Sequence, residues 1–199
     1  MDTKLKVNSK IIFSTLLTSL FLLIYGCSPS GILATGGGTA MVVAEGDRSI
    51  GTVVDDATVK INIAAKFLNA GNNLFVDINT TVLEGRVLLT GLVDNQELRI
   101  EAVRLVWEIE GVREVVNEIE IGSREDIKDY VKDLWINTQA RGVAAKTIGL
   151  RVVAYNFETI NGKIYIAGIT TKPDQIDVLI ESLKTIKGVT EIVNYVIVK

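Results

Sequence analysis

An internal repeat of 77 residues constrains the fold of this chain more than any other feature of its sequence. Residues 82–121 align without a gap onto residues 159–198, and eight of the 40 aligned positions are identical. The identities fall on glycines and on regularly spaced apolar residues, where a shared backbone restricts the choice of side chain most. The chain therefore contains two copies of one small domain. At about 70 residues each copy is marginal alone, so we expect the two copies to pack together.

Both copies show the same order of predicted elements, and this order predicts an α+β fold. A helix is followed by two strands joined by a tight turn, a second helix and a last strand. The α-β-β-α-β order predicts a three-stranded mixed sheet with two helices on one face, because a helical crossover makes its two strands parallel. In the first copy we expect a helix at Asp56–Asn69, strands at Leu74–Leu83, Arg86–Thr90 and Val112–Ile121, and a turn at Glu84-Gly85; in the second copy the turn is Asn161-Gly162 and the last strand is Val189–Val198.

The first helix of each copy carries apolar residues at helical spacing. These residues are expected to face the core because they recur every four positions along one side of the helix. They are Val59, Ile63 and Phe67 in the first copy and, 77 residues later, Ile136, Ala140 and Ala144 in the second.

Polar and glycine residues mark the expected ends of other elements. Asp94 or Asn95 is expected to cap the second helix of the first copy. Gly91 and Gly168 are expected to end the second strand of each copy.

The first 27 residues have the pattern of an export signal that ends in a lipid-attachment site. Lys4, Lys6 and Lys10 precede the apolar run Ile11–Tyr25, which at 15 residues is shorter than the about 20 that a membrane span needs. The string Ile24-Tyr25-Gly26-Cys27 resembles a bacterial lipobox, in which the cysteine is acylated and becomes the mature N-terminus. Acylation would also explain a lone cysteine in an oxidising compartment. The alternatives are an ordinary signal peptide with an incidental cysteine, or an uncleaved anchor.

The sequence predicts four segments. They are a lipoprotein signal peptide at 1–26, an acylated N-terminus and flexible tether at 27–46, and the two domains at 47–122 and 123–199. The tether is predicted from its glycines and small residues. Ser28 follows the cysteine, and by resemblance to enteric lipoproteins a serine there favours the outer membrane, with the acyl chains as anchor.

The composition excludes several classes of function. The chain has no histidine and one cysteine, which removes Ser-His-Asp and Cys-His catalysis, histidine-based metal sites and disulfides. The net charge is −3, and because residues 1–26 carry +2, the remaining 173 carry −5, which argues against broad nucleic-acid binding. Asp55 and Asp56 are interpreted as acids at a helix start rather than as a catalytic pair, since adjacent side chains point apart. We predict neither an enzyme nor a cofactor or metal site.

Each copy carries the motif Gly-x-hydrophobic-x-hydrophobic-x-Gly, then a helix, then Gly-Val-x-x-Val-x-Asn. The first copy has Gly85-Arg-Val-Leu-Leu-Thr-Gly91 and Gly111-Val-Arg-Glu-Val-Val-Asn117, and the second has Gly162-Lys-Ile-Tyr-Ile-Ala-Gly168 and Gly188-Val-Thr-Glu-Ile-Val-Asn194. This pattern resembles the BON domain of Gram-negative envelope proteins. From Cys27 to Lys199 the chain is similar to outer-membrane lipoproteins with two such domains, also in the segments 47–56 and 133–138.

The resemblance implies a non-enzymatic lipoprotein on the periplasmic side of the outer membrane. It implies binding of anionic phospholipids, phosphatidylglycerol and cardiolipin, through the first helix of the second domain, and a role in envelope integrity and at division sites. The residues expected to bind lipid are Trp135, Thr138, Gln139, Arg141, Gly142, Ala145 and Lys146. Ala145 stands where the resembled helix has a larger aliphatic residue.

The two tryptophans leave alternatives open. Trp135 and Trp107 align with Thr58 and Lys184 of the other copy, so both replace polar residues at positions expected to be exposed. Trp135 either contacts lipid at headgroup depth or is buried between the two copies. For Trp107, burial between the copies is the favoured interpretation. Alternative functions are an adaptor that binds another envelope protein and, more distantly, a periplasmic chaperone resembling the osmotic-stress member of the BON family.

Overall fold

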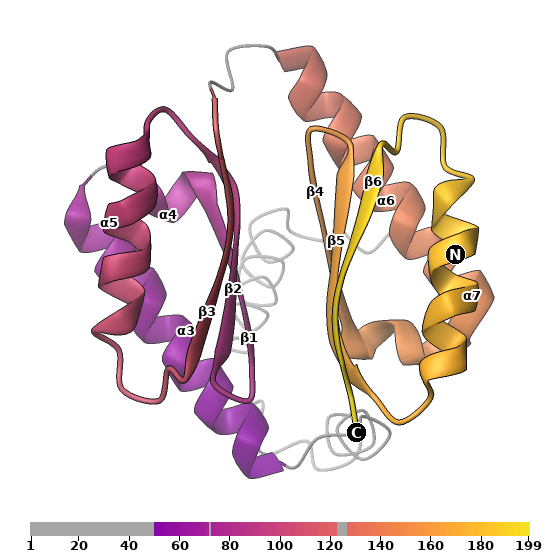
Figure 1. Cartoon of the computed structure of the whole chain (residues 1–199), viewed down its shortest axis with the longest axis horizontal. Coiled ribbons are helices and arrows are strands. Elements are labelled where there is room, and N and C mark those ends of the chain that lie inside the picture. Colours follow the sequence, from indigo (N-terminus) through magenta and orange to yellow (C-terminus); the bar gives the residue numbers. More distant parts are fainter. Residues whose placement is uncertain (1–49, 72, 123–126) are drawn as a thin grey trace, which may run out of the picture. The chain divides into compact units, whose positions relative to one another are not determined.

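The computed structural model describes residues 50–71, 73–122 and 127–199, which all fall within one compact unit of the chain. Cys27, the predicted signal peptide and the predicted tether lie outside the described residues. The described residues form two successive domains with the same topology (Figure 1).

The first domain has a three-stranded mixed sheet with its helices on one face (Figure 1). Its elements are α3 (Ile50–Ala70), α4 (Leu74–Asp77), β1 (Ile78–Leu83), β2 (Arg86–Val93), α5 (Gln96–Trp107) and β3 (Glu114–Ile121). Strand β2 lies in the centre, antiparallel to β1 and parallel to β3.

The second domain repeats this arrangement. Its elements are α6 (Ile127–Ile148), the 3₁₀ helix η2 (Gly149–Ala154), β4 (Tyr155–Ile160), β5 (Lys163–Thr170), α7 (Pro173–Lys184) and β6 (Glu191–Val198). Strand β5 is central, antiparallel to β4 and parallel to β6. The predicted α+β fold, with a mixed three-stranded sheet in each copy, is confirmed.

Each domain has its own hydrophobic core between helices and sheet. The six residues predicted to face the core are all at most 5% exposed: Val59, Ile63, Phe67, Ile136, Ala140 and Ala144. In the first domain they pack with Val87 and Leu89 of β2, and in the second with Ile164 and Ile166 of β5.

A third apolar cluster joins the two domains. It contains Leu83 and Leu88 of the first domain and Ala167 and Ile169 of the second. Strands β2 and β5 are therefore buried on both faces, which explains their almost continuous apolar sequences. This cluster agrees with the expectation that the two copies pack together. A domain of about 70 residues buries little apolar area alone and gains more by packing against the other copy.

The acid Asp56 has a different structural role from the one predicted. Helix α3 already includes residue 50, so Asp56 does not lie at a helix start. Its buried carboxylate accepts hydrogen bonds from the backbone N–H groups of Glu84 and Gly85, at 2.8 and 3.0 Å. Asp133 of α6 binds the N–H groups of Asn161 and Gly162 in the same way, at 2.7 and 2.8 Å. One aspartate on the first helix thus holds the hairpin turn of each domain.

Two predicted strand limits are wrong in the first domain. Residues 74–77 form the helical turn α4, so β1 begins only at Ile78. Gly91 does not end β2, but pairs with Ile78 inside the strand. A Cβ at Gly91 would lie 2.1 Å from the Asp77 carbonyl oxygen, so glycine here admits the start of β1 rather than stopping β2.

Three further predictions concern Gly168, the cap of α5 and the start of β3. Gly168 likewise lies inside its strand, since β5 continues to Thr170. Asn95 is confirmed as the cap of α5, because its side-chain oxygen accepts the N–H of Leu98 at 2.9 Å. The last strand of the first domain begins at Glu114 rather than Val112, because the Val112 N–H bonds the Ile109 carbonyl in a turn.

Candidate functional site

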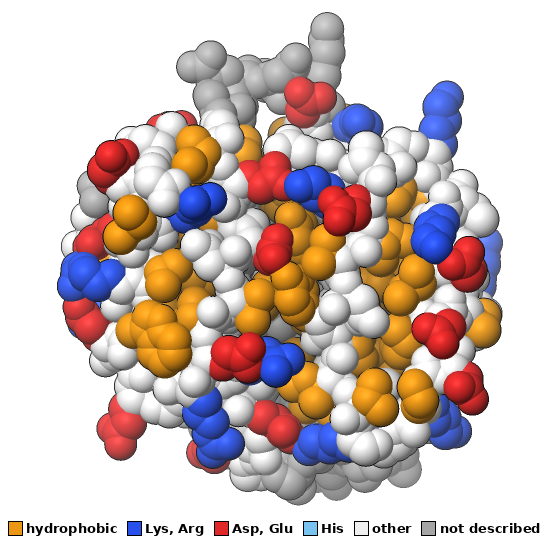
Figure 2. Space-filling model, in the orientation of Figure 1, with side chains coloured by type: hydrophobic (Ala, Val, Ile, Leu, Met, Phe, Trp, Pro, Cys, Tyr) orange, Lys and Arg blue, Asp and Glu red, His pale blue; other side chains and the backbone are white. Residues whose placement is uncertain are grey.

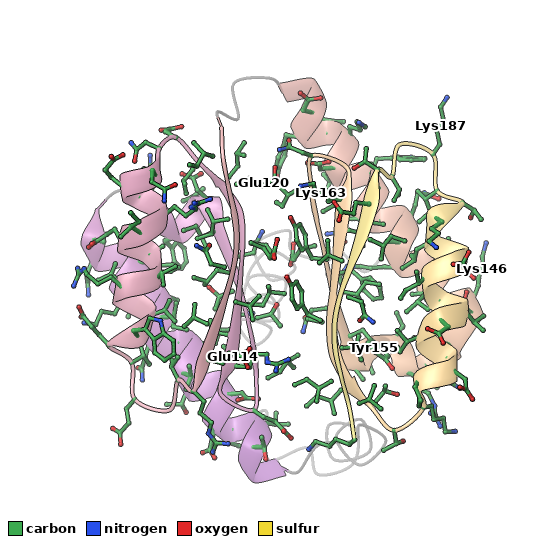
Figure 3. All side chains as sticks on the ribbon, in the orientation of Figure 1. Glu114, Glu120, Lys146, Tyr155, Lys163 and Lys187 are labelled. Carbon is green, nitrogen blue, oxygen red and sulfur yellow. The ribbon has the colours of Figure 1, made fainter. Side chains whose placement is uncertain are left out.

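All seven residues predicted to bind lipid lie on α6, and all seven are exposed. Trp135 is 47% exposed, so it is not buried between the copies. Gln139, Gly142 and Lys146 follow at i+4, i+7 and i+11 and share its helix face. Figure 3 shows Lys146 on the helical side of the domain, pointing away from the sheet. The buried stripe of α6 thus leaves this opposite face to solvent.

Thr138 and Ala145 flank the Trp135 face. The Thr138 hydroxyl donates its proton to the Leu134 carbonyl at 2.9 Å, so toward an external ligand it can act only as an acceptor. Ala145 is exposed and contributes a single methyl group. These two residues therefore add little charge and little apolar area to the face.

The Arg141 side chain points toward β4 and not toward the Trp135 face. Its Nη2 donates to the carbonyl of Phe157 in β4 at 3.2 Å, which turns the guanidinium toward the sheet edge. Burial raises the pKa of the neighbouring Glu158 carboxyl, and the positive charges of Arg141 and Lys60 oppose that rise. Of the seven predicted residues, Arg141 is the one that the structure separates from the Trp135 face.

Sequence reasoning missed the apolar residues beside Trp135. Val131 and Leu134 are each 55% exposed, at i−4 and i−1 from the tryptophan. Lys132, also exposed, lies between them in sequence. Helical spacing counted backward from Trp135 would have identified Val131 at i−4 and Lys132 at i−3, whereas Leu134 at i−1 lies about 100° around the helix.

The face is also free of acidic groups. Asp133 is the only acidic residue between positions 131 and 146, and its carboxylate binds the hairpin turn on the other side of the helix. An exposed aromatic residue with aliphatic neighbours and two lysines suits an apolar surface that carries negative headgroups.

Trp107 contradicts the predicted burial between the copies. It is the last residue of α5 and is 53% exposed. Ile100, seven residues earlier on the same helix, is also exposed. The equivalent residue of the second domain, Lys184, is exposed as well, although its side chain is charged rather than aromatic.

Charge on the visible surface is mixed. Figure 2 shows acidic and basic side chains interspersed among apolar ones on that face. Within residues 50–71, 73–122 and 127–199, no helix is both long and apolar enough to cross a bilayer. The same residues contain no group of three or more acidic, histidine or cysteine side chains placed to hold a metal ion.

The sequence matches the family model of the BON domain twice, over residues 55–123 and 132–199. The chain belongs to the BON-domain family.

Three relatives have sequences similar to most of this chain. The chain is 35% identical over 147 residues to an uncharacterized protein in the gshII 5′ region of Anaplasma centrale, which spans 73% of this chain and 96% of that protein. It is 30% identical over 161 residues to the outer membrane lipoprotein DolP of Haemophilus influenzae, spanning 79% and 82%. It is 23% identical over 197 residues to osmotically-inducible protein Y of Escherichia coli, spanning 96% of each. None of the three has the name of an enzyme.

The two BON domains differ on the face that carries Trp135. In the first domain the residues equivalent to Lys132, Trp135 and Lys146 are Asp55, Thr58 and Asn69. The equivalent positions of the first domain therefore have neither the aromatic residue nor the two lysines, although the buried stripe of the helix is retained. A feature that the fold does not require in one copy is a candidate for function in the other.

Proposed function

We propose that this BON protein is an outer-membrane lipoprotein that binds anionic phospholipids, such as phosphatidylglycerol and cardiolipin, through α6 of its second domain. In this proposal it supports the integrity of the envelope, including at division sites. The observation that carries the proposal is the half-exposed Trp135, with the exposed Val131 one turn before it, on a helix face with two lysines and no acid.

The chemistry of this face fits an anionic membrane surface. Tryptophan favours the headgroup boundary, where its ring is apolar and its indole N–H stays near water. Val131 adds exposed apolar area one turn before Trp135, and Lys132 and Lys146 add positive charge that would attract lipid phosphates. Each lysine near an anionic surface contributes about 1 kcal/mol. Because residues 27–199 carry a net charge of −5, attraction must come from this local patch.

Location at the outer membrane is supported by two observations. The relative DolP is an outer membrane lipoprotein, and the similarity spans 82% of it. The string that ends at Cys27 supplies an acylation site, followed by Ser28. Two or three acyl chains would fix the protein at the membrane, so α6 would need only weak affinity to lie on its surface.

A titration followed by NMR tests the proposal. The full-length protein in zwitterionic micelles is titrated with phosphatidylglycerol, and in a parallel series with more zwitterionic lipid. We expect chemical-shift changes at Val131, Trp135 and Lys146 with the anionic lipid only. Equal changes with both lipids, or changes confined to the first domain, would refute binding through α6.

A second candidate function is an adaptor for another envelope protein. It is favoured by the exposed Trp107 and Ile100 on α5, because an exposed tryptophan is a frequent anchor of protein interfaces. A crosslinker placed at position 107 tests it. One protein that is crosslinked in envelopes from position 107, but not from the exposed position 181 of α7, would support the adaptor.

A further inference from the structure

A cavity of about 280 Å³ lies on the side of α6 that is turned away from Trp135. Its walls come from both domains: Val76 of α4 and Leu92 of β2 in the first, and α6 with β4 in the second. This volume is near the lower limit of small-molecule sites. Leu134 borders both the cavity and the proposed lipid face, whereas Lys132, Trp135 and Lys146 of that face do not line the cavity.

Two buried oxygen atoms in the wall of this cavity lack a hydrogen-bond partner. They are Oδ1 of Asn137 and Oγ1 of Thr159, and no other buried side-chain nitrogen or oxygen among the described residues is unpartnered. Thr159 is only 7% exposed. Leaving a buried polar atom unpaired costs about 1–3 kcal/mol, so two such atoms on residues that line one cavity indicate a ligand that pairs with them.

The repeat provides an internal control for these two oxygens. The residues equivalent to Asn137 and Thr159 in the first domain are Lys60, which is exposed, and Val82, which is buried in the core. The nearby Asp133 is retained as Asp56, with the same two hydrogen bonds to the turn. The fold therefore needs the aspartate but does not need polar groups at positions 137 and 159.

The charges around the cavity select a positive ligand. The carboxylates of Asp129, Asp133 and Glu158 line it, and no lysine or arginine is among the lining residues that the structure describes. Arg141 and Lys60 act on Glu158 from outside the wall, and the Asp133 carboxylate accepts two backbone N–H groups but forms no ion pair with the described residues. The described residues offer no group of three acidic, histidine or cysteine side chains that could hold a metal ion.

We infer that this cavity binds a primary ammonium group on a short alkyl chain. The ammonium would donate hydrogen bonds to Asn137 Oδ1 and Thr159 Oγ1 and face the carboxylates of Asp129 and Asp133. Val76 and Leu92 would cover the alkyl chain. Such a group occurs in free diamines and in the ethanolamine headgroup of phospholipids, and the same wall chemistry would recognise either.

Titration of the full-length protein with 1,4-diaminobutane tests the inference. In zwitterionic micelles, followed by NMR, we expect saturable shifts at Asn137, Thr159 and Leu92, and none with the neutral analogue 1,4-butanediol. Thr159→Val should weaken binding about tenfold, since one hydrogen bond to a charged group contributes about 1.5 kcal/mol or more. This variant should fold, because Val82 fills the equivalent position.

Thr147→Val is the matched control. Thr147 lies on the same helix, does not line the cavity, and donates its hydroxyl proton to the Val143 carbonyl. It should leave diamine binding unchanged. Equal shifts with the diamine and the diol, or equal diamine binding by Thr159→Val and the parent chain, would overturn the ammonium site.

A second arm distinguishes the two sources of the ammonium. Phosphatidylethanolamine is compared with phosphatidylcholine in the same micelles, since the trimethylated headgroup cannot donate hydrogen bonds. Shifts at Thr159 with phosphatidylethanolamine but not with the diamine would assign the ammonium to a lipid headgroup. Shifts with the diamine alone would assign it to a soluble amine. No response to either would mean that water alone fills the cavity, and would overturn the inference.

Discussion

Glu118 and Tyr195 occupy equivalent positions in the two repeats, 77 residues apart, and the Tyr195 hydroxyl donates a hydrogen bond to the Glu118 carboxylate. Equivalent residues that touch each other lie near the axis that relates two copies. The two residues differ and complement each other, because Glu118 is an acceptor in the first domain and Tyr195 is a donor in the second. The contact between the domains is therefore specific to this pair of unlike copies.

A neighbouring contact also pairs an acid of the first domain with donors of the second. Glu120 of β3 accepts hydrogen bonds from Lys163 and Asn161 of the second domain, at 2.8 and 2.7 Å. Figure 3 shows Glu120 and Lys163 pointing toward one another. Burial alone would raise the pKa of the Glu120 carboxyl, but the bonds from Lys163 and Asn161 outweigh burial and hold this pKa below its usual range.

We expect Tyr195→Phe to lower the free energy of unfolding by about 1–2 kcal/mol. The change removes one hydrogen bond to a charged group and leaves Glu118 partly buried without that donor. Equilibrium unfolding of the full-length protein in urea measures the effect. In a double-mutant cycle with Glu118→Gln, the two changes should be non-additive, and additive effects would show that the pair does not stabilise the fold.

The same tyrosine predicts a loss of stability at alkaline pH. Burial, and then the hydrogen bond to Glu118, raise the pKa of Tyr195 to about 12. The folded-state pKa is above the unfolded value of about 10, so the stabilisation is complete below pH 10 and is lost as the pH rises toward 12. The melting temperature should therefore fall less steeply over this range in Tyr195→Phe than in the parent chain. Parallel pH profiles would contradict this prediction.

Asp56→Ala should destabilise the first domain by about 2–4 kcal/mol. The buried carboxylate accepts the N–H groups of Glu84 and Gly85, and its removal leaves both donors without this partner. Its exposed neighbour provides the control, since Asp55→Ala should change stability by less than about 0.5 kcal/mol. Urea unfolding of both variants measures the difference, and similar effects in the two would show that the turn does not depend on Asp56.

The repeat made the fold predictable because both copies follow one pattern of spacing. The apolar stripes of α3 and α6 had to face a core, and Gly-Val-x-x-Val-x-Asn had to continue into a parallel strand. Asn117 and Asn194 show why the motif ends in asparagine: each side-chain oxygen accepts the backbone N–H two residues later, at 3.1 and 2.9 Å.

Tertiary contacts account for what the sequence could not indicate. Gly91 has the sequence pattern of a strand end, but the carbonyl of Asp77 on the neighbouring segment makes glycine necessary inside the strand. Asp56 has the pattern of a helix start, but its partners lie 28 and 29 residues away. At the candidate site, Trp135 was predictable as an unusual residue within the repeat, whereas the direction of Arg141 depends on the Phe157 carbonyl.

Two glycine substitutions should have opposite effects on stability. Gly91→Ala should lower the free energy of unfolding by more than about 3 kcal/mol, because the new Cβ would clash with the Asp77 carbonyl and Gly91 has a φ of +147°. Gly142→Ala should raise it by about 1 kcal/mol, because this exposed helix position has open space around its Cα. Thermal unfolding of the two variants measures both, and a shift of the same sign in both would contradict the glycine geometry.

The two half-exposed tryptophans provide the sharpest test of the lipid face. Trp135→Glu removes the exposed apolar ring next to Val131 and adds a negative charge to a face that has no acid. Loss of roughly 100 Å² of apolar contact is worth on the order of 2 kcal/mol, so affinity for phosphatidylglycerol should fall roughly thirtyfold or more. Trp107→Glu carries the same chemical change at an equally exposed position on α5 and should bind lipid like the parent chain.

NMR titration in micelles measures the affinities, and urea unfolding confirms that both variants are folded. Equal weakening by the two substitutions would show that charge alone, rather than the α6 face, controls binding.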